Sequence, residues 1–504
     1  MELRKTNFSN LRFLQILIPS AISLLSFLIA HIAGFDRIHI PLNAWQLLDK
    51  ELLLTKPIQS LTLLHVQPPG LNATLAAILR ISSFLGINPE AITYILFVIL
   101  GTIASVYLYK TIIKFTNAHV FAALPVLIFT FNPASWVYGH RFFYPYILAC
   151  LFIFLAYQIQ KVFLDGDKVH KPIILVTIMI IIISNFRSLY HPLWGISLFF
   201  LMAAMYTSIF RVKFRKFLQK EWVVILFLLL GLLLWPIKNK ILFGQFTFSS
   251  WQGFNLSRGT DVTSEVIEDY RREGFVPDRI HTALDQFQIR HGISAPNVLS
   301  QIEKSTGGRN WNHYLFLDQN PTLTRQAILY RLQNPLHWIK QTIFHYLTWT
   351  MPSFINPYTG ELYGPDTTLY RQYARGIRNI FFYDLRPPLG TLIPPGFRWP
   401  HVIRLNRDVP FTIFGLLCFP TLLSLSILMT KEKWHSGKKA EAAFLALILF
   451  NVSWALAIPC LTDGYEGNRM RYAIFPLLLM ILYSALGSLC LRQKLGDHKD
   501  TFYD

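Results

Sequence analysis

Charged residues are scarce in this chain. Of its 504 residues, 15% are Asp, Glu, Lys or Arg and 53% are hydrophobic. Soluble domains carry about 25% charged residues, so the composition excludes an ordinary soluble protein and indicates a polytopic membrane protein. The formal net charge of +19 would suit a nucleic-acid binder. The Lys and Arg residues, however, cluster in short segments between apolar runs, as topology signals do. We therefore expect no nucleic-acid partner.

Cysteine is also scarce. The four cysteines, Cys150, Cys418, Cys460 and Cys490, lie within or beside apolar runs. Their spacing indicates neither a metal site nor a disulfide framework, so we interpret them as packing residues. The first apolar run, 11–32, is longer than the core of a signal peptide and lacks a small-residue cleavage site, which favours a retained membrane anchor.

Long apolar runs, in contrast, are abundant. A spanning helix needs roughly 17–25 mostly apolar residues. The candidate spans are 11–34, 91–115, 118–131, 142–163, 173–184, 193–210, 222–237, 411–429, 442–459 and 472–491. The sequence therefore predicts an all-α polytopic membrane protein with about ten transmembrane helices.

Segment 70–86 is the ambiguous run. It contains Asn72 and Arg80, and its large apolar residues favour one helical face, which is typical of a helix lying in the membrane interface. If it does not cross, and the N-terminus is cytoplasmic, the short basic connections also become cytoplasmic. These are 110–117, 161–171, 211–220, 431–439 and the tail from residue 492. The charge pattern thus predicts juxtamembrane helices in the first external loop.

This orientation divides the chain into three parts. Residues 1–238 form an N-terminal transmembrane module with the first external loop at 35–90. Residues 239–408, rich in Trp, Tyr, Asn and Pro, are long enough for an extracytoplasmic domain, which we expect to be of mixed structure. Residues 409–504 supply the last spans. Within the second part, the apolar stretch PLHWIKQTIFHYLTWTM at 335–351 carries polar residues, and we place it on the membrane surface.

The outer ends of the predicted spans carry charge. Asp36 directly follows the first span, and the stretch HVQPPGLN at 65–72 interrupts the next apolar region with two prolines, which cannot continue a helix. The other candidates for substrate binding are His65, Gln67, Arg141, Arg187, His191, Glu466, Arg469 and Arg471. A solvated Asp36 beside Arg37, and arginines that extend to lipid headgroups, are the alternative interpretation. Several cations on the non-cytoplasmic side oppose the usual bias, which favours an anionic ligand such as a lipid phosphate.

A carboxylate opposite a group of cations at this boundary suits one reaction. Transfer of a sugar from a lipid phosphate to a hydroxyl needs a base for the acceptor's proton. It also needs cations that stabilise the departing phosphate. Because phosphate leaves without protonation, one carboxylate suffices, whereas glycoside hydrolysis uses two.

The order of these motifs resembles the GT-C superfamily of membrane glycosyltransferases. The similarity lies in Asp36 after the first span, then WQLLDKELL, LHVQPPGLN, NPASWVYGHRFFYP and the late GNRMRY before the last span. The family's His-Pro-Pro-Leu-like element differs here, because Val66 and Gln67 separate His65 from the prolines and Gly70 precedes the leucine.

That resemblance implies a polyprenyl-phosphate-linked sugar donor and a glycan, lipid or protein acceptor. It implies that Asp36 is the general base and that Arg469 or Arg471 contacts the donor phosphate. It also implies a site on the extracytoplasmic face of a bacterial plasma membrane, among membrane lipids. Some members use a divalent metal, for which Glu466, His65 and His191 are conceivable ligands.

Two other classes of function remain open. A transporter or lipid flippase would use Arg and Glu along a substrate path, although no inverted repeat is visible. A polymerase or ligase for lipid-linked saccharides would share the arginines and would not need the Asp36 loop.

Overall fold

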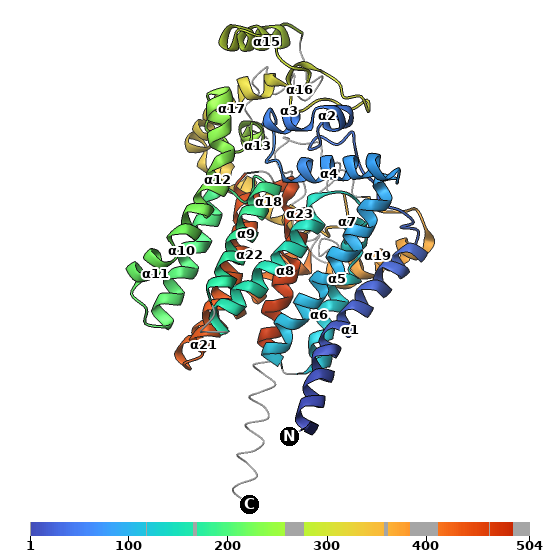
Figure 1. Cartoon of the computed structure of the whole chain (residues 1–504), viewed down its shortest axis with the longest axis vertical. Helices are drawn as coiled ribbons and strands as arrows, with labels where there is room; N and C mark the ends of the chain where they lie inside the picture. The colour runs from blue at the N-terminus through green and yellow to red at the C-terminus, as the bar shows by residue number, and fades with distance from the viewer. Residues whose placement is uncertain are drawn as a thin grey trace, which may run out of the picture.

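Helices form nearly all the regular structure of the chain. The computed structural model describes residues 2–116, 118–164, 169–257, 277–356, 361–383, 412–462 and 464–486. Within these ranges, β-pairing is limited to three isolated bridges, such as the one between His39 and Arg141. An all-α polytopic architecture was predicted, and the described residues agree with it (Figure 1).

The helices fall into a long bundle and a set of shorter helices at one of its ends. The first part of the chain comprises α1 (Glu2–Ile32), α2 (Lys50–Thr55), α3 (Pro57–Thr62), α4 (Gly70–Leu85), α5 (Pro89–Thr116), α6 (His119–Thr130), α7 (Pro133–Gly139), α8 (Tyr144–Leu164), α9 (His170–Phe186), α10 (Pro192–Ile209), α11 (Phe214–Lys220) and α12 (Trp222–Phe243). The second part comprises α13 (Gln252–Ser257), α15 (Pro277–His291), α16 (Asn297–Ser300), α17 (Tyr314–Gln333), α18 (Pro335–Thr350), α19 (Thr368–Phe381), η2 (Phe414–Cys418), α21 (Phe419–His435), α22 (Lys439–Leu461), η3 (Gly464–Glu466) and α23 (Gly467–Ala473).

Seven helices in the described residues are long and apolar enough to cross a membrane, or up to nine if each of two bent pairs is one span. One pair joins α6 to α7 with a bend of 58°, and the other joins α23 to a helix at Phe475–Leu486 with a bend of 54°. The predicted run 173–184 corresponds to α9, which has 17 residues and falls among the shorter apolar helices. The structure thus confirms a multi-pass membrane protein and leaves the count of ten spans as a prediction.

Local sequence explains where the helices begin and stop at the end of the bundle opposite the N-terminus. Asn132 caps α7 by accepting a hydrogen bond from the Ala134 amide at 2.8 Å, and Pro133 supplies a pre-set first residue. His191 and Pro192 start α10 in the same way. Gly86, with φ of +66°, ends α4 in the left-handed conformation that glycine adopts without strain.

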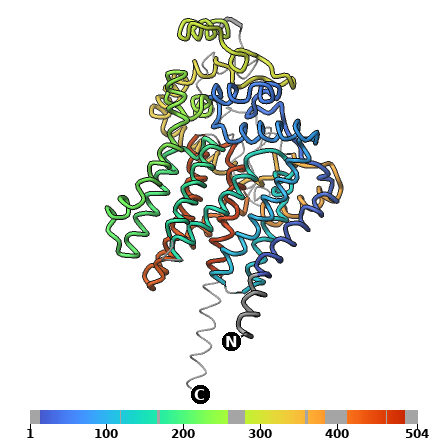
Figure 2. The backbone as a smooth tube through the Cα atoms, in the orientation of Figure 1, coloured from blue at the N-terminus to red at the C-terminus, as the bar shows by residue number. Residues whose placement is uncertain are grey.

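Helix α4 runs across the end of the bundle instead of along it (Figures 1 and 2). It packs on α2, α5 and α9 through buried residues such as Leu75 and Ile78. Its last turn exposes Phe84, which is 88% accessible. An amphipathic helix that does not run with the bundle is what the apolar pattern of 70–86 predicted.

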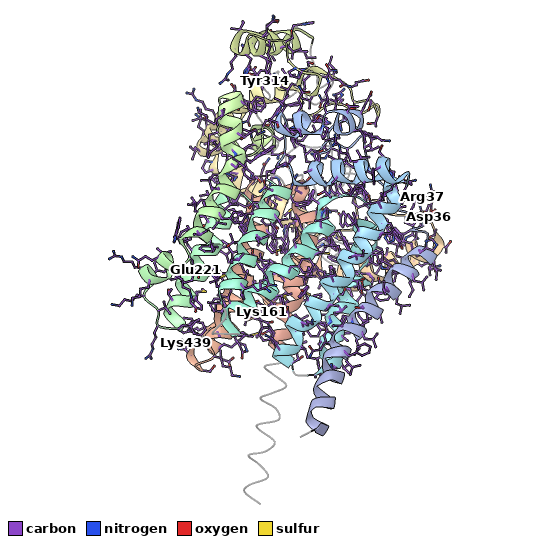
Figure 3. All side chains as sticks on the ribbon, viewed as in Figure 1. Asp36, Arg37, Lys161, Glu221, Tyr314 and Lys439 are labelled. Carbon is purple, nitrogen blue, oxygen red and sulfur yellow. The ribbon has the colours of Figure 1, made fainter. Side chains whose placement is uncertain are left out.

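The two ends of the bundle carry different charged side chains. Figure 3 shows Lys161 and Lys439 toward the end that carries the N-terminus, whereas Asp36 and Arg37 lie toward the opposite end. Basic α11 and the connection between α21 and α22 also lie at the N-terminal end (Figure 1). The predicted cytoplasmic connections around Lys161, α11 and Lys439 therefore share one end, and the predicted basic tail from residue 492 lies outside the described residues.

The shorter helices at the other end come partly from the 239–408 region. Its described residues contain helices and loops but no strand, so the mixed structure we expected is not seen there. Helix α13 packs on α17, and α18, the PLHWIKQTIFHYLTWTM stretch predicted to lie on the membrane surface, packs on α22 and α23. Apolar side chains of α18 and α22 thus join the bundle's core, in which Trp349 is fully buried.

Candidate functional site

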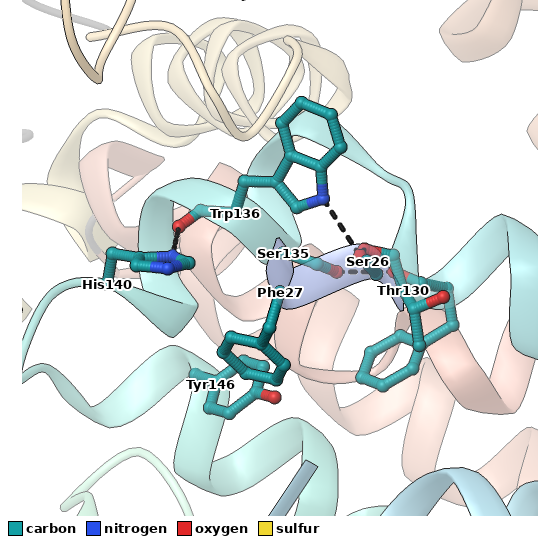
Figure 4. A pocket seen from close by; sticks show the side chains of 8 residues that line it. Ser26, Phe27, Thr130, Ser135, Trp136, His140 and Tyr146 are labelled. Atoms are coloured by element: carbon teal, nitrogen blue, oxygen red, sulfur yellow. Dashed lines mark hydrogen bonds between the residues drawn. The ribbon is translucent and has the colours of Figure 1, made fainter. Parts of the chain in front are cut away.

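Hydrogen bonds to Ser26, near the end of α1, hold the corner between α7 and α8 in place. The Trp136 indole donates a hydrogen bond of 3.0 Å to the Ser26 hydroxyl, which donates one of 2.7 Å to the Thr130 carbonyl. Figure 4 shows this chain and the His140 ring, whose Nδ1 donates to the Trp136 carbonyl at 2.8 Å. The cavity lined by these residues has about 10 Å³, room for one water. It is packing space, and its role is to hold the corner that carries Arg141.

The loop after α1 lies against that corner. The His39 amide donates to the His140 carbonyl, and the Phe142 amide donates to the His39 carbonyl, both at 2.9 Å. This pairing brings the loop that contains Asp36 beside Arg141. The Asp36 carboxylate itself is 64% exposed, 3.6 Å from Arg37 Nε, and lies at the flank of the molecule (Figure 3).

A buried carboxylate, Glu466, is the centre of the polar residues at this end. Its Oε2 lies 3.3 Å from Arg187 and accepts a hydrogen bond from the Tyr144 hydroxyl. Its Oε1 lies 3.0 Å from Arg469. These residues come from α8, the end of α9, η3 and α23, so side chains from across the sequence meet here. A buried carboxylate requires such partners, because burial without them costs several kcal/mol.

Gln67 connects the HVQPPGLN stretch to this centre. Its carbonyl oxygen accepts hydrogen bonds of 3.2 Å from Arg187 Nη1 and from the Ser188 hydroxyl. Arg187 also lies 5.5 Å from the Trp45 ring, within range of a cation–π contact. Trp45 stacks on Trp251 at 4.6 Å. The loops between α1 and α4 and the segment after α12 therefore both reach Arg187.

One further arginine, Arg141, brings an excess of positive charge. Arg141 and Arg469 lie over the same ring, Phe143, at 5.9 and 5.3 Å from its centroid. Glu466 forms ion pairs with Arg187 and Arg469, and Arg141 adds a third guanidinium group beside the ring that it shares with Arg469. The Nε atoms of Arg141 and Arg187 are buried with no hydrogen-bond partner among the described residues. Buried donors and surplus positive charge are what an anionic group such as a phosphate would satisfy.

The structure places the remaining predicted residues outside this cluster. Arg471 donates to the Met351 carbonyl at 2.6 Å and to the Ser353 hydroxyl at 3.0 Å, and so holds the end of α18. His65 Nδ1 lies 2.7 Å from the Ser250 hydroxyl. Burial lowers the pKa of His65 to about 3, so its ring is neutral at physiological pH.

His191 also has a local role in the structure. Its Nδ1 accepts a hydrogen bond of 3.3 Å from the Leu193 amide and so caps α10. Burial lowers its pKa as well. The proposed metal ligands Glu466, His65 and His191 thus have different surroundings. Among the described residues, no three His, Cys, Asp or Glu side chains form a group that could hold a metal ion.

Sequence reasoning missed two aromatic members of the cluster. Tyr144 follows Arg141 within the same motif, NPASWVYGHRFFYP, and a polar ring at the start of a span was a usable signal. Tyr363, whose hydroxyl accepts from Arg469 at 3.4 Å, comes from the loop before α19, and no local pattern indicated it.

Comparison with known proteins adds no further assignment. No protein-family model matches the chain, and no match is found among curated proteins or among solved structures.

Proposed function

We propose that this protein is a glycosyltransferase that moves a sugar from a polyprenyl-phosphate donor to an acceptor hydroxyl at the outer end of the bundle. The observation that carries the proposal is an excess of positive charge: Arg187 and Arg469 pair with the buried Glu466, and Arg141 lies on the same Phe143 ring as Arg469. A membrane enzyme with a buried arginine cluster at one end of its bundle suits a lipid-anchored phosphate, because the lipid chain remains in the bilayer.

The proposed reaction is a single displacement. The donor phosphate binds Arg141 and Arg469, which stabilise the negative charge that develops as the bond between the sugar's anomeric carbon and the phosphate oxygen breaks. The acceptor oxygen forms the new bond to that carbon, and its proton passes to Asp36. The pairing of His39 with the 140–142 segment supports this role, since it holds the Asp36 loop beside Arg141. The open position of Asp36 leaves it accessible to an acceptor that approaches from outside.

The proposal includes an orientation. We place the Lys161 and Lys439 end in the cytoplasm of a bacterial cell and the arginine cluster on the extracytoplasmic face of the plasma membrane. Helix α9 then crosses the membrane as a tenth span, because α8 ends at the Lys161 end of the bundle whereas α10 begins next to Arg187, at the end that holds the arginine cluster. Helix α4 lies in the outer interface.

The decisive experiment replaces the proposed base. Purified protein in proteoliposomes is supplied with radiolabelled polyprenyl-phosphate sugars, and release of polyprenyl phosphate is measured. General-base catalysis typically contributes 10²–10⁴-fold, so Asp36→Asn should lower turnover by roughly that factor. Asp366→Asn is the matched control, because Asp366 is also exposed and paired with a nearby arginine, Arg371. Full activity of Asp36→Asn would overturn the mechanism.

A second candidate function rests on the separation of the two carboxylates. Glu466 lies within the arginine cluster and Asp36 does not. A polymerase or ligase for lipid-linked saccharides would bind a phosphate at the arginines without using Asp36. The same variants distinguish the two, because Arg469→Gln would abolish the ligase while Asp36→Asn would leave it active.

A further inference from the structure

Helix α19 divides its side chains between an arginine face and an apolar face. Arg371, Arg375 and Arg378 follow at spacings of four and three, which places them along one side of a helix. All three residues are exposed. The apolar residues share the other side: Leu369, Tyr370, Tyr373, Ala374, Ile377, Ile380 and Phe381. Such a division is typical of helices that lie in the plane of a membrane surface.

Hydrogen bonds and a ring contact fix α19 at the outer end of the first span. The Thr367 hydroxyl, which caps α19, donates to the Ala33 carbonyl at 2.6 Å. The Tyr370 ring lies edge-on to Phe35 at 5.0 Å, and the Tyr373 hydroxyl donates to the Phe131 carbonyl. Figure 1 shows α19 beside the end of α1 that is farthest from the N-terminus. The helix therefore lies at the level where the span leaves the hydrocarbon.

Protein covers only part of the apolar face of α19. Tyr370 and Ala374 are fully buried, whereas Leu369 is 52% and Ile380 is 67% exposed. In the nearby α1, the last residue, Ile32, is also 67% exposed. Exposed apolar side chains at the end of a membrane span are suited to contact with lipid chains, and they continue the apolar surface of α1 outward.

The charges of α19 call for an anionic partner. Arg371 pairs with Asp366 at 2.6 Å, but Arg375 and Arg378 have no ion-pair partner among the described residues. Clustered cations beside an outer span end oppose the usual charge bias. We propose that Arg375 and Arg378 bind the phosphate headgroups of anionic lipids in the outer leaflet, with Leu369 and Ile380 in the acyl-chain boundary. This binding does not depend on the proposed transferase activity.

The experiment measures which lipid surrounds α19. The full-length protein carries Gln372→Cys with a fluorophore, in a background with Cys418→Ser and Cys490→Ser, and is placed in nanodiscs of phosphatidylcholine and phosphatidylglycerol. One lipid or the other is brominated, and bromine quenches the fluorophore when that lipid lies close to α19. We expect brominated phosphatidylglycerol to quench more than brominated phosphatidylcholine. In Arg375→Gln/Arg378→Gln this preference should fall, by roughly 5-fold for each arginine.

Three controls separate charge, position and ligand source. Arg375→Lys/Arg378→Lys keeps the charge and should retain the preference. Arg325→Gln, an exposed arginine on α17, should not change it. Millimolar inorganic phosphate at constant ionic strength should leave it intact, since the ligand is a lipid. Equal quenching by both lipids in the parent protein, or loss of the preference on adding inorganic phosphate, would overturn the proposal. Circular dichroism confirms that the variants fold.

Discussion

Glu466 shows how a single residue can organise the end of the bundle opposite the N-terminus. Its two oxygens engage Arg187 and Arg469, on segments more than two hundred residues apart in sequence, and both side chains of the Arg187–Glu466 pair are almost completely buried. Buried pairs add little net stability compared with apolar packing, but removing one partner leaves an uncompensated charge. Glu466 therefore fixes the positions of the arginines, while Arg141 retains surplus charge for a ligand.

This role of Glu466 predicts that the effects of replacing Glu466 and Arg187 on the free energy of unfolding are not additive. Glu466→Gln should lower the free energy of unfolding by about 3–5 kcal/mol, because Arg187 loses its buried partner. The double variant Glu466→Gln/Arg187→Gln should lose less than the sum of the two single variants. Denaturant unfolding in detergent measures both. The exposed pair Asp366–Arg371 is the control, with a coupling of about 0–1 kcal/mol. Strict additivity at Glu466 would contradict the role assigned to it.

At the scale of elements, local patterns predicted helices better than sites. The apolar face of 70–86 predicted an interface helix, and the structure has α4 across the bundle. The double proline of HVQPPGLN predicted the break between α3 and α4. Within that break, however, Gln67 reaches the cluster and His65 does not. His65 is held by Ser250 and Asn312, which are 185 and 247 residues away in sequence, and no local pattern carries such contacts.

The break between α3 and α4 can be tested at Gly70, the first residue of α4. A Cβ placed there would lie 2.6 Å from the backbone oxygen of Asn185 at the end of α9. Backbone cannot yield as a flexible side chain does, so Gly70→Ala should destabilise the protein by about 1–3 kcal/mol. Gly376→Ala in α19 is the control, since nothing lies within 4 Å of its Cβ. Thermal unfolding should show a lower midpoint for the first variant and no loss for the second.

The two ends of the whole molecule differ in charge and in architecture, and the sequence predicted only part of this difference. Lysines at the N-terminal end of the bundle, such as Lys161 and Lys439, follow from the spacing of apolar runs and basic connections. The architecture at the other end could not be predicted in the same way. Its stability depends on contacts such as those of α13 with α17 and of α18 with α22, which join segments distant in sequence. Hydrophobic periodicity describes one segment at a time. It therefore predicted individual helices at that end but not how they pack together.

The asymmetry predicts the orientation of the protein. Ser83 on α4 and Ser436 between α21 and α22 are both exposed, and they lie at opposite ends of the bundle. With Cys418→Ser and Cys490→Ser as background, Ser83→Cys should react with a membrane-impermeant maleimide in intact cells. Ser436→Cys should react only after the membrane is permeabilised, because the basic connection around it should be retained in the cytoplasm. The reverse pattern would place the arginine cluster inside, where an acceptor on the cell surface could not reach it, and the proposed reaction would have to be abandoned.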